Sequence, residues 1–306
     1  MTLTAAVRQV LSNYGDERPG IRANLARMLM HGATGGSGKL LILPVDQGFE
    51  HGPARSFAPN PPAYDPLYHF ELAIAAGVSA YAAPLGALAA GAGRFAGEVP
   101  LILKANSANA LSTIKDEAIT GTVRDALELG CAAIGFTIYP GSDRQYEMFE
   151  EVRAAIAEAR TFGLPTVLWA YPRGGSLSSE GETALDVVAY GAQIAAQLGA
   201  HIIKVKIPSD HVELASSRAT YQDFDTSDAA KGIAHVVQSA FAGRRLVVFS
   251  GGALKERADL DAEVQAIIAG GGSGSIIGRN SFQRPLEDAV AMLRRVAALY
   301  VSGGPG

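Results

Sequence analysis

Two lysines stand two residues apart in the segment HIIKVKIP, residues 201–208, among isoleucine and valine neighbours. These neighbours are typical of a strand buried on both faces, and side chains two positions apart on a strand share a face. Lys204 and Lys206 are therefore expected to point the same way. Burial of an ammonium group beside a second positive charge favours its neutral form, and a neutral amine can attack a carbonyl carbon to form a Schiff base. The same spacing also fits a simpler interpretation, in which the pair neutralises nearby carboxylates or binds an anion.

Other residues with useful chemistry end further apolar runs of the sequence. Asp46 ends LLILPVD, Lys104 ends PLILK, and Trp169 and Tyr171 lie close together in PTVLWAY. A tyrosine can exchange a proton with a reacting hydroxyl group, and an aspartate can orient or deprotonate one. Each residue alone also has a structural interpretation, because a tyrosine at a strand end is commonly a packed ring with a hydrogen-bonded tip, and tryptophan is commonly core.

Loops rich in small residues follow the last two apolar runs. FSGGAL contains Ser250, Gly251 and Gly252, and GGGSGSIIGRNS contains Gly278 and Arg279. Small residues let backbone N–H groups approach an anion, and an arginine adds a bidentate charged contact. We therefore expect a phosphate site here, with tight turns alone as the alternative function of the glycines.

A metal site is the other chemistry that the segment VDQGFEHGP suggests. Asp46, Glu50 and His51 are all possible metal ligands, but the other histidines of the chain form no H-x-H or H-x-x-x-H pair. We expect no catalytic metal and no cofactor.

The elements that must position these residues form a regular series from residue 40 onward. Short apolar runs alternate with longer amphipathic segments such as 116–130 and 184–199, for which we predict helices. The runs are 40–46, 78–84, 100–104, 132–138, 165–171, 200–206, 245–250 and 273–279. Eight such units predict a single (β/α)8 TIM barrel, with an open doubly wound sheet as the alternative. Because chemistry in such barrels gathers at the C-terminal ends of the strands, the residues above should converge.

Three regions are predicted along the chain. They are an N-terminal helical extension (1–39), the barrel catalytic domain (40–301) and a flexible tail (302–306). The extension should contain two short helices and a glycine-rich turn, and should cover the bottom of the barrel or contact a partner subunit. The turn from Gly32 to Lys39 has part of a phosphate-loop spacing, but Leu40 replaces the required hydroxyl residue, so we interpret it as a connector.

Composition excludes several classes of function. The chain has 306 residues, 48% of them hydrophobic and 18% charged, with a net charge of −4, so a basic nucleic-acid surface is not expected. The single cysteine, Cys131, excludes an internal disulfide and fits a reducing cytoplasm, and we expect it in the core. No secretory signal is visible, and the uncharged run Ala73 to Gly93 is interpreted as a helix end, a strand and a small-residue loop rather than a membrane span. We therefore expect a cytoplasmic protein without membrane or nucleic-acid partners.

Six segments, in order, resemble the archaeal-type class I fructose-bisphosphate aldolases, which are also found in bacteria. They are LPVDQGFEHGP, LILKAN, TVLWAYPRGG, GAHIIKVKIP, SGGA and IIGRNSF, and the resemblance extends from about residue 38 to about residue 300. The aspartate loop and the W-x-Y-P-R-G motif are its most specific parts. The resemblance implies a (β/α)8 enzyme that cleaves fructose 1,6-bisphosphate reversibly to glycerone phosphate and glyceraldehyde 3-phosphate through a lysine imine, without metal.

The resemblance also implies roles for individual residues. The catalytic group would be Lys204 as Schiff-base lysine, Tyr171 for proton transfer, Asp46 at the substrate hydroxyls and Trp169 shaping the pocket. The C1 phosphate would be bound by Ser250, Gly251, Gly252, Gly278 and Arg279. The remaining substrate contacts would be Arg173 and Lys104 at the other end and His51 from its loop, while Lys206 would depress the pKa of Lys204 or contact a phosphate.

The chain departs from the family pattern at two places. After the lysines it reads IPSDHVELASSRATYQDFD where relatives with other products often have a T-G-D turn, and KAN replaces the expected Lys-Leu-Asn. The acidic residue that assists imine formation is therefore not assigned. Alternatives are a related Schiff-base aldolase or transferase acting on another phosphorylated ketose, and a non-catalytic sugar-phosphate binding barrel. Small-residue helices and the N-terminal extension also indicate a homo-oligomer.

Overall fold

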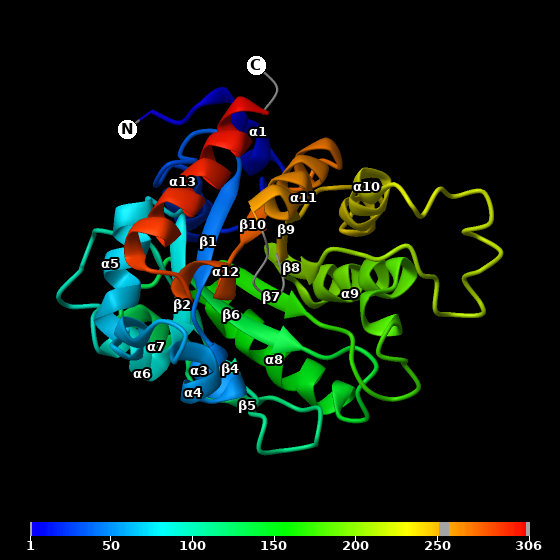
Figure 1. Cartoon of the computed structure of the whole chain (residues 1–306), viewed down its shortest axis with the longest axis horizontal. Helices are drawn as coiled ribbons and strands as arrows, with labels where there is room; N and C mark the ends of the chain where they lie inside the picture. The colour runs from blue at the N-terminus through cyan, green and yellow to red at the C-terminus, as the bar shows by residue number, and fades with distance from the viewer. Residues whose placement is uncertain (1, 251–256, 304–306) are drawn as a thin grey trace.

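A closed barrel of parallel strands forms the centre of the protein (Figure 1). The computed structural model describes residues 2–250 and 257–303, and in this part of the chain eight strands close in the order β1-β2-β3-β6-β7-β8-β9-β10. Their bounds are β1 Leu40–Pro44, β2 Ala80–Pro84, β3 Leu101–Lys104, β6 Ala133–Ile138, β7 Thr166–Ala170, β8 Ile202–Lys206, β9 Leu246–Ser250 and β10 Gly274–Ile276. The predicted TIM barrel is confirmed, and the open-sheet alternative is wrong.

Helices follow the strands and cover the outside of the barrel (Figure 1). Beyond the two N-terminal helices they are α3 Gln47–His51, α4 Pro53–Phe57, α5 Pro66–Ala76, α6 Leu85–Ala89, α7 Val123–Glu128, α8 Gln145–Thr161, α9 Leu185–Leu198, α10 Ala229–Ser239, α11 Arg257–Ala269, α12 Arg279–Phe282 and α13 Leu286–Ser302, with 3-10 turns η1 Pro61–Tyr64 and η2 Gly181–Thr183. The predicted helix 184–199 is confirmed as α9.

The predicted helix 116–130 is wrong over its first half. Residues Ala118–Ile119 form the short strand β5, which pairs antiparallel with β4, Asn106–Ser107. The helix begins only after Thr122, whose side chain accepts a hydrogen bond from Asp125 N while the Asp125 carboxylate accepts one from Thr122 N. This capping box fixes the start of α7 and leaves residues 116–121 as extended chain above the barrel.

Alternation along the strands divides the core into two parts. Outward side chains such as Leu41 and Ile203 pack beneath the surrounding helices, where Cys131 is also buried as expected. Inward side chains such as Ile42 and Ile202 fill the barrel. Lys204 has the same parity as Ile202, so its side chain points into the barrel.

The N-terminal helices close one end of the barrel. Residues of α1 (Ala5–Ser12) and α2 (Pro19–Leu29) belong to the same hydrophobic cluster as the inward side chains of the strands. In Figure 1, α1 lies at the end opposite to α3 and to the β4–β5 ribbon. The expected cover at the bottom of the barrel is therefore confirmed. At the end of the glycine-rich turn, Lys39 Nζ donates a hydrogen bond to Gly272 O at 2.7 Å, which joins the turn to the segment before β10.

A glycine in β6 makes room for the one tryptophan of the chain. Trp169 on β7 is 2% exposed and pairs with Thr137 of β6, two residues from Gly135. A Cβ atom at position 135 would overlap the indole ring. Gly135 is thus required by close packing across the strands.

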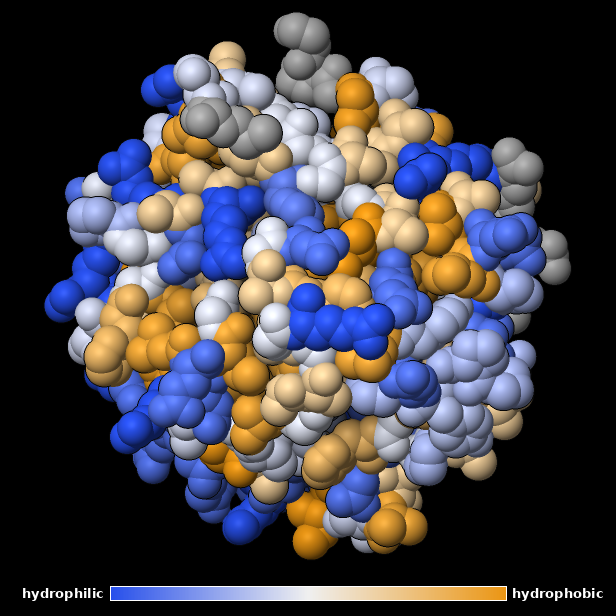
Figure 2. Space-filling model, turned by 90° about the vertical axis from the view of Figure 1, so that its left-hand side faces the viewer, coloured by the Kyte–Doolittle hydropathy of each residue, from blue (hydrophilic) through white to orange (hydrophobic). Residues whose placement is uncertain are grey.

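The uncharged run 73–93 contains the end of α5 and strand β2 as expected, but the short helix α6 begins where a small-residue loop was predicted. Within residues 2–250 and 257–303, no helix has both the length and the apolar character of a membrane span. On the side of the molecule at the left of Figure 1, hydrophobic side chains are interspersed with hydrophilic ones (Figure 2). Most of the predicted tail, 302–306, lies outside the described residues.

Candidate active site

A cavity of about 370 Å³ opens at the C-terminal ends of the strands. Of the residues predicted to act on a substrate, it is lined by His51, Tyr171, Arg173, Lys204, Lys206, Ser250, Gly278 and Arg279. Gln47, Glu50, Thr183 and Ser209 contribute further polar groups to its wall. Residues from the first, fifth, sixth, seventh and eighth barrel strands, or from the loops that follow them, therefore meet in one place, as the barrel architecture requires.

Lys204 is the most deeply buried amine of this cavity, at 6% exposure. Burial lowers the pKa of its amine to about 7; Asp46 and Glu50 oppose this effect, whereas Lys104 and then Lys206 add to it. Within the described part of the chain, the Lys204 amine has no hydrogen-bond or ion-pair partner. A sizeable fraction of this side chain is therefore neutral at physiological pH and available as a nucleophile.

Tyr171 lies beside the buried lysine. Lys204 Nζ is 4.4 Å from the centroid of the Tyr171 ring. The guanidinium carbon of Arg173, which lies on the loop between β7 and α9, is 5.3 Å from the same centroid. Tyr171 lines both this cavity and a smaller one next to it. Its position allows proton exchange with a group bound to Lys204.

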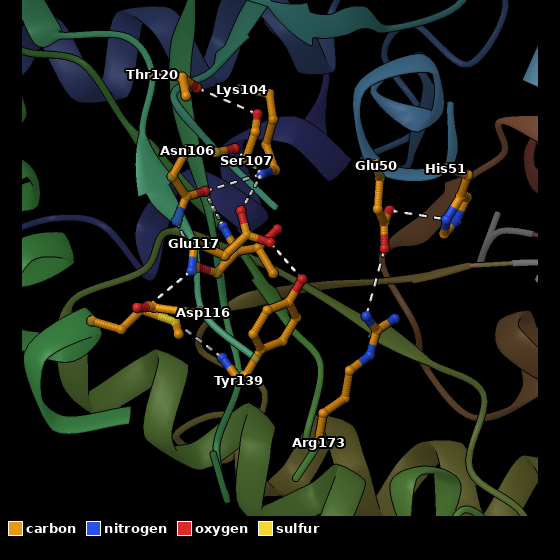
Figure 3. Close-up of polar contacts among 12 residues, drawn as sticks. Glu50, His51, Lys104, Asn106, Ser107, Asp116, Glu117, Thr120, Tyr139 and Arg173 are labelled. Carbon is orange, nitrogen blue, oxygen red and sulfur yellow. Dashed lines mark hydrogen bonds and ion pairs between the residues drawn. The ribbon is translucent and has the colours of Figure 1, made fainter. Parts of the chain in front are cut away.

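Charged side chains form an ion-pair network at the rim of the cavity (Figure 3). The Glu50 carboxylate lies 3.7 Å from His51 Nε2 and 3.5 Å from Arg173 Nη1. Glu182 Oε2 lies 3.5 Å from Lys206 Nζ and 4.0 Å from Arg173 Nε. Burial lowers the pKa of Lys206, and Glu182 opposes that shift. Two cations thus face the cavity and share one carboxylate.

Three of the residues predicted to bind the C1 phosphate belong to the same cavity. Ser250, Gly278 and Arg279 all line it, and a Cβ atom at position 278 would approach Pro44 O to 2.9 Å. Gly278 therefore lets the backbone pass close to β1. Gly251 and Gly252, which were predicted to bind the same phosphate, lie outside the described residues.

A smaller cavity of about 30 Å³ continues the site toward β3 and β6. Lys204 and Tyr171 line it together with Asp46, Lys104, Glu117 and Tyr139. A volume of this size accommodates about one water molecule. Asp46 thus lies in the deeper part of the site with the two principal catalytic candidates.

Two of the predicted site residues have different surroundings from those expected. Lys104 is 3% exposed, and its ammonium donates to Asn106 O, to Asn106 Oδ1 and to Glu117 Oε2. An ammonium has three protons, so none is left for a substrate phosphate. Trp169 lines neither cavity and lies in the barrel interior, 5.9 Å from Lys104 Nζ. These two side chains support the floor of the site.

Glu117 and Tyr139 are site residues that sequence reasoning missed. Tyr139 donates a hydrogen bond of 2.5 Å to Glu117 Oε1, while Glu117 Oε2 pairs with Lys104 at 3.4 Å (Figure 3). Burial raises the pKa of Glu117, and Lys104 opposes that shift. The prediction of a helix over 116–130 concealed Glu117, whereas its position after KAN, on a loop following a barrel strand, was the available signal. Tyr139 follows the fourth apolar run directly.

The comparisons with known proteins agree with this geometry. The model of the DeoC/LacD family of aldolases matches residues 40–284. The chain belongs to the DeoC/LacD aldolase family. A probable class 1 fructose-bisphosphate aldolase of Chlamydia muridarum is 35% identical over 300 residues, which cover 94% of this chain and 86% of that protein. The class 1 fructose-bisphosphate aldolase of Thermoproteus tenax is 36% identical over 268 residues, 87% of this chain and 91% of that protein.

A solved structure of this aldolase family is similar over most of the chain. It is an archaeal fructose-1,6-bisphosphate aldolase with its catalytic lysine covalently bound to the carbinolamine intermediate of the substrate. Its TM-score is 0.73 at 35% sequence identity, covering 87% of this chain and 95% of that one. The resemblance noted in the sequence is confirmed at the level of the family and the fold.

Proposed function

We infer that this protein is a class I aldolase that cleaves fructose 1,6-bisphosphate reversibly to glycerone phosphate and glyceraldehyde 3-phosphate through a lysine imine. The observation that carries the inference is Lys204, a buried amine whose pKa is lowered to about 7, in the wall of a cavity rimmed by cations. The relatives from Chlamydia muridarum and Thermoproteus tenax carry this activity in their names. The reaction belongs to glycolysis and gluconeogenesis.

The first stage forms the imine. The neutral amine of Lys204 adds to the C2 carbonyl of the open-chain sugar, and the carbinolamine loses water to give a protonated imine. Tyr171, with its ring 4.4 Å from Lys204 Nζ, and the small cavity lined by both residues support proton exchange at this point. The positive iminium then withdraws electrons from C3.

The second stage breaks the C3–C4 bond. Tyr171, aided by Asp46, removes the proton of the C4 hydroxyl group, glyceraldehyde 3-phosphate leaves, and the bonding electrons pass into the iminium to form an enamine. Protonation at C3 restores the iminium, which water hydrolyses to glycerone phosphate and free Lys204. Asp46 supports this assignment because it lines the deeper cavity together with Tyr171 and Lys204.

We propose that the two phosphates bind to different parts of the larger cavity. We propose Ser250, Gly251, Gly252, Gly278 and Arg279 for the C1 phosphate, and Arg173, Lys206 and His51 for the C6 phosphate. Arg173 and Lys206 both line the cavity, which supports the second site. Arg173 pairs with Glu50 and Glu182 and Lys206 pairs with Glu182, but a guanidinium has five N–H donors and an ammonium three, so both retain donors for a phosphate. Lys104 is no longer proposed as a phosphate ligand.

Borohydride reduction in the presence of substrate tests the imine. Reduction should inactivate the enzyme and label Lys204, located by mapping the peptides. A label on Lys206 would assign the nucleophile to that lysine, two residues further along β8. The absence of any label would contradict the imine mechanism. A borohydride reaction without substrate is the control.

A coupled cleavage assay over a panel of phosphorylated ketoses tests the substrate. We expect fructose 1,6-bisphosphate to be cleaved fastest, and we expect activity to persist with EDTA. Faster cleavage of another ketose phosphate would make the protein a related Schiff-base aldolase or transferase. Binding without turnover would identify a sugar-phosphate sensor.

We also propose that the enzyme acts in the cytoplasm as a homo-oligomer. Tyr146 on α8 and Tyr190 on α9 are 71% and 60% exposed on helices that pack side by side, which supports a subunit contact on this face. Exposed aromatic residues are enriched at protein interfaces. Analytical ultracentrifugation of the wild type and of Y146S/Y190S tests the proposal, and a monomeric wild type would contradict it.

A further inference from the structure

Glu117 is a buried carboxylate close to the reacting lysine. It lies on the β4–β5 loop, directly before β5, and is 6% exposed. Its two oxygens have separate partners, Tyr139 Oη at 2.5 Å and Lys104 Nζ at 3.4 Å (Figure 3). A carboxylate in such surroundings is costly to bury unless it is paired and hydrogen-bonded, and both conditions are met here.

Lys104 is fixed by the same group of side chains. Its ammonium also contacts Asn106, at 3.0 Å from Oδ1 and through a close contact with the backbone oxygen. Asn106 is held in turn by Thr137, whose N donates to Oδ1 at 2.7 Å and whose O accepts from Nδ2 at 2.8 Å. The Lys104 side chain is therefore fixed by protein groups alone.

The position of Lys104 matters because it lines the small cavity together with Lys204. Among the positive charges that lower the pKa of Lys204, Lys104 acts most strongly and Lys206 comes second. The sequence had suggested Lys206 for this effect. A neighbouring ammonium lowers the pKa of a lysine only while it is charged and close, and a carboxylate paired with that ammonium favours both conditions.

We propose that Glu117 is a positioning residue of the aldolase, which holds the Lys104 ammonium in place beside Lys204 and so favours the neutral form of the reacting amine. This inference rests on the proposed imine function of Lys204. Among the described residues, the Glu117 carboxylate bonds to Lys104 and Tyr139 and not to Lys204, so it acts through Lys104. It is also an acidic residue near the imine, for which the sequence offered no assignment.

Several other charges face Lys204 and set the background for this effect. Asp46, between β1 and α3, and Glu50, in α3, favour the charged form of the lysine, whereas Lys206 on β8 favours the neutral form. Glu117 itself faces Lys104 and Tyr139, with Asp46 and Glu50 as further negative charges. A single substitution at Glu117 leaves all of these groups in place.

The test is the pH dependence of borohydride trapping in E117Q, which keeps the shape of the side chain and removes its charge. Without the carboxylate, the Lys104 ammonium is held less firmly beside Lys204, and Lys204 therefore keeps its own proton more tightly. The acid limb of trapping should therefore move to higher pH by about one unit, with about fivefold less trapping at pH 7 and little change in KM. E117D should restore much of the wild-type profile.

K104M gives a second route to the same result, whether or not E117Q folds well. It should move the acid limb in the same direction, and E117Q/K104M should match K104M alone, because Glu117 acts through that lysine. E128Q is the matched control, since Glu128 pairs with Arg124 on the exposed surface of α7. Its profile should equal that of the wild type.

An unmoved acid limb in folded E117Q, or a shift to lower pH, would overturn the proposal, because the effect of Lys104 on Lys204 would then not depend on Glu117. Failure of the imine function gives a different result, namely no label on Lys204 in the wild type. The two outcomes are therefore distinguishable in one set of reactions.

Discussion

The two ends of strand β8 hold buried polar groups that are treated in opposite ways. At its start, Tyr14 Oη donates to His201 O at 2.6 Å and accepts from Leu246 N at 3.0 Å, and the His201 ring accepts from Thr166 N at 3.0 Å. Further along the strand, toward the active site, Lys204 is also buried but has no polar partner among the described residues. The first arrangement stabilises the fold, and the second leaves a group free to react.

The contrast indicates that the buried, unpaired amine of Lys204 lowers the free energy of unfolding. A buried polar group without a partner destabilises the folded state, whereas a satisfied one costs little or contributes. Substitutions at the two ends should therefore separate activity from stability. The predictions below test that separation, beginning with the largest effect.

Replacement of Lys204 by methionine should abolish the reaction without weakening the fold. We expect cleavage to fall by about 10⁴-fold or more, since the covalent nucleophile is lost. Because a buried amine is replaced by an apolar side chain of similar length, the free energy of unfolding should stay equal or rise. Turnover assays and urea denaturation measure the two quantities, and strong destabilisation would contradict the comparison.

Replacement of Tyr171 by phenylalanine should slow turnover by about 10²–10⁴-fold, the usual contribution of a general acid or base. Imine formation with glycerone phosphate should survive better than cleavage, because Lys204 is intact. Single-turnover cleavage and borohydride trapping separate the two steps. Unchanged turnover would remove Tyr171 from the proton-transfer role.

Stability should depend on pH through Lys204. Its pKa falls from 10.5 to about 7 on folding, so the unfolded chain binds more protons between these values. The contribution is present in full above pH 10.5 and is lost as pH falls through 7. The difference in unfolding free energy between wild type and K204M should rise with pH in this window, by at most about 1.4 kcal/mol per unit. Parallel pH profiles would contradict the lowered pKa.

Replacement of Tyr14 by phenylalanine should have the smallest effect on turnover and still weaken the fold. It leaves His201 O and Leu246 N without their shared partner, which costs about 1–3 kcal/mol. Urea denaturation should show this loss, while kcat stays within about twofold because the site lies at the far end of the barrel. A large fall in kcat would show that the two ends are coupled.

Much of the fold was predictable because each barrel strand is a continuous apolar run, which parallel strands covered on both faces require. Lys204, Tyr171 and Asp46 were predictable for the related reason that polar residues at the ends of such runs are conspicuous. Glu117 was not, because DEAITGTVRDALELG has helical character throughout, and only the Thr122–Asp125 cap determines where the helix starts. The sequence also did not predict that all three N–H donors of Lys104 are taken up inside the protein, because this depends on its contacts with Glu117 and with the side chain of Asn106.

The fit between Gly135 and Trp169 has a consequence for how this barrel can change over evolutionary time. Any side chain at position 135 overlaps the indole ring, so larger residues are excluded there as long as the tryptophan is present. Substitution at position 169 can come first, because a smaller residue there leaves a void that a later substitution at position 135 can fill. The two positions are therefore expected to vary together, and the order of substitutions decides which descendants can fold.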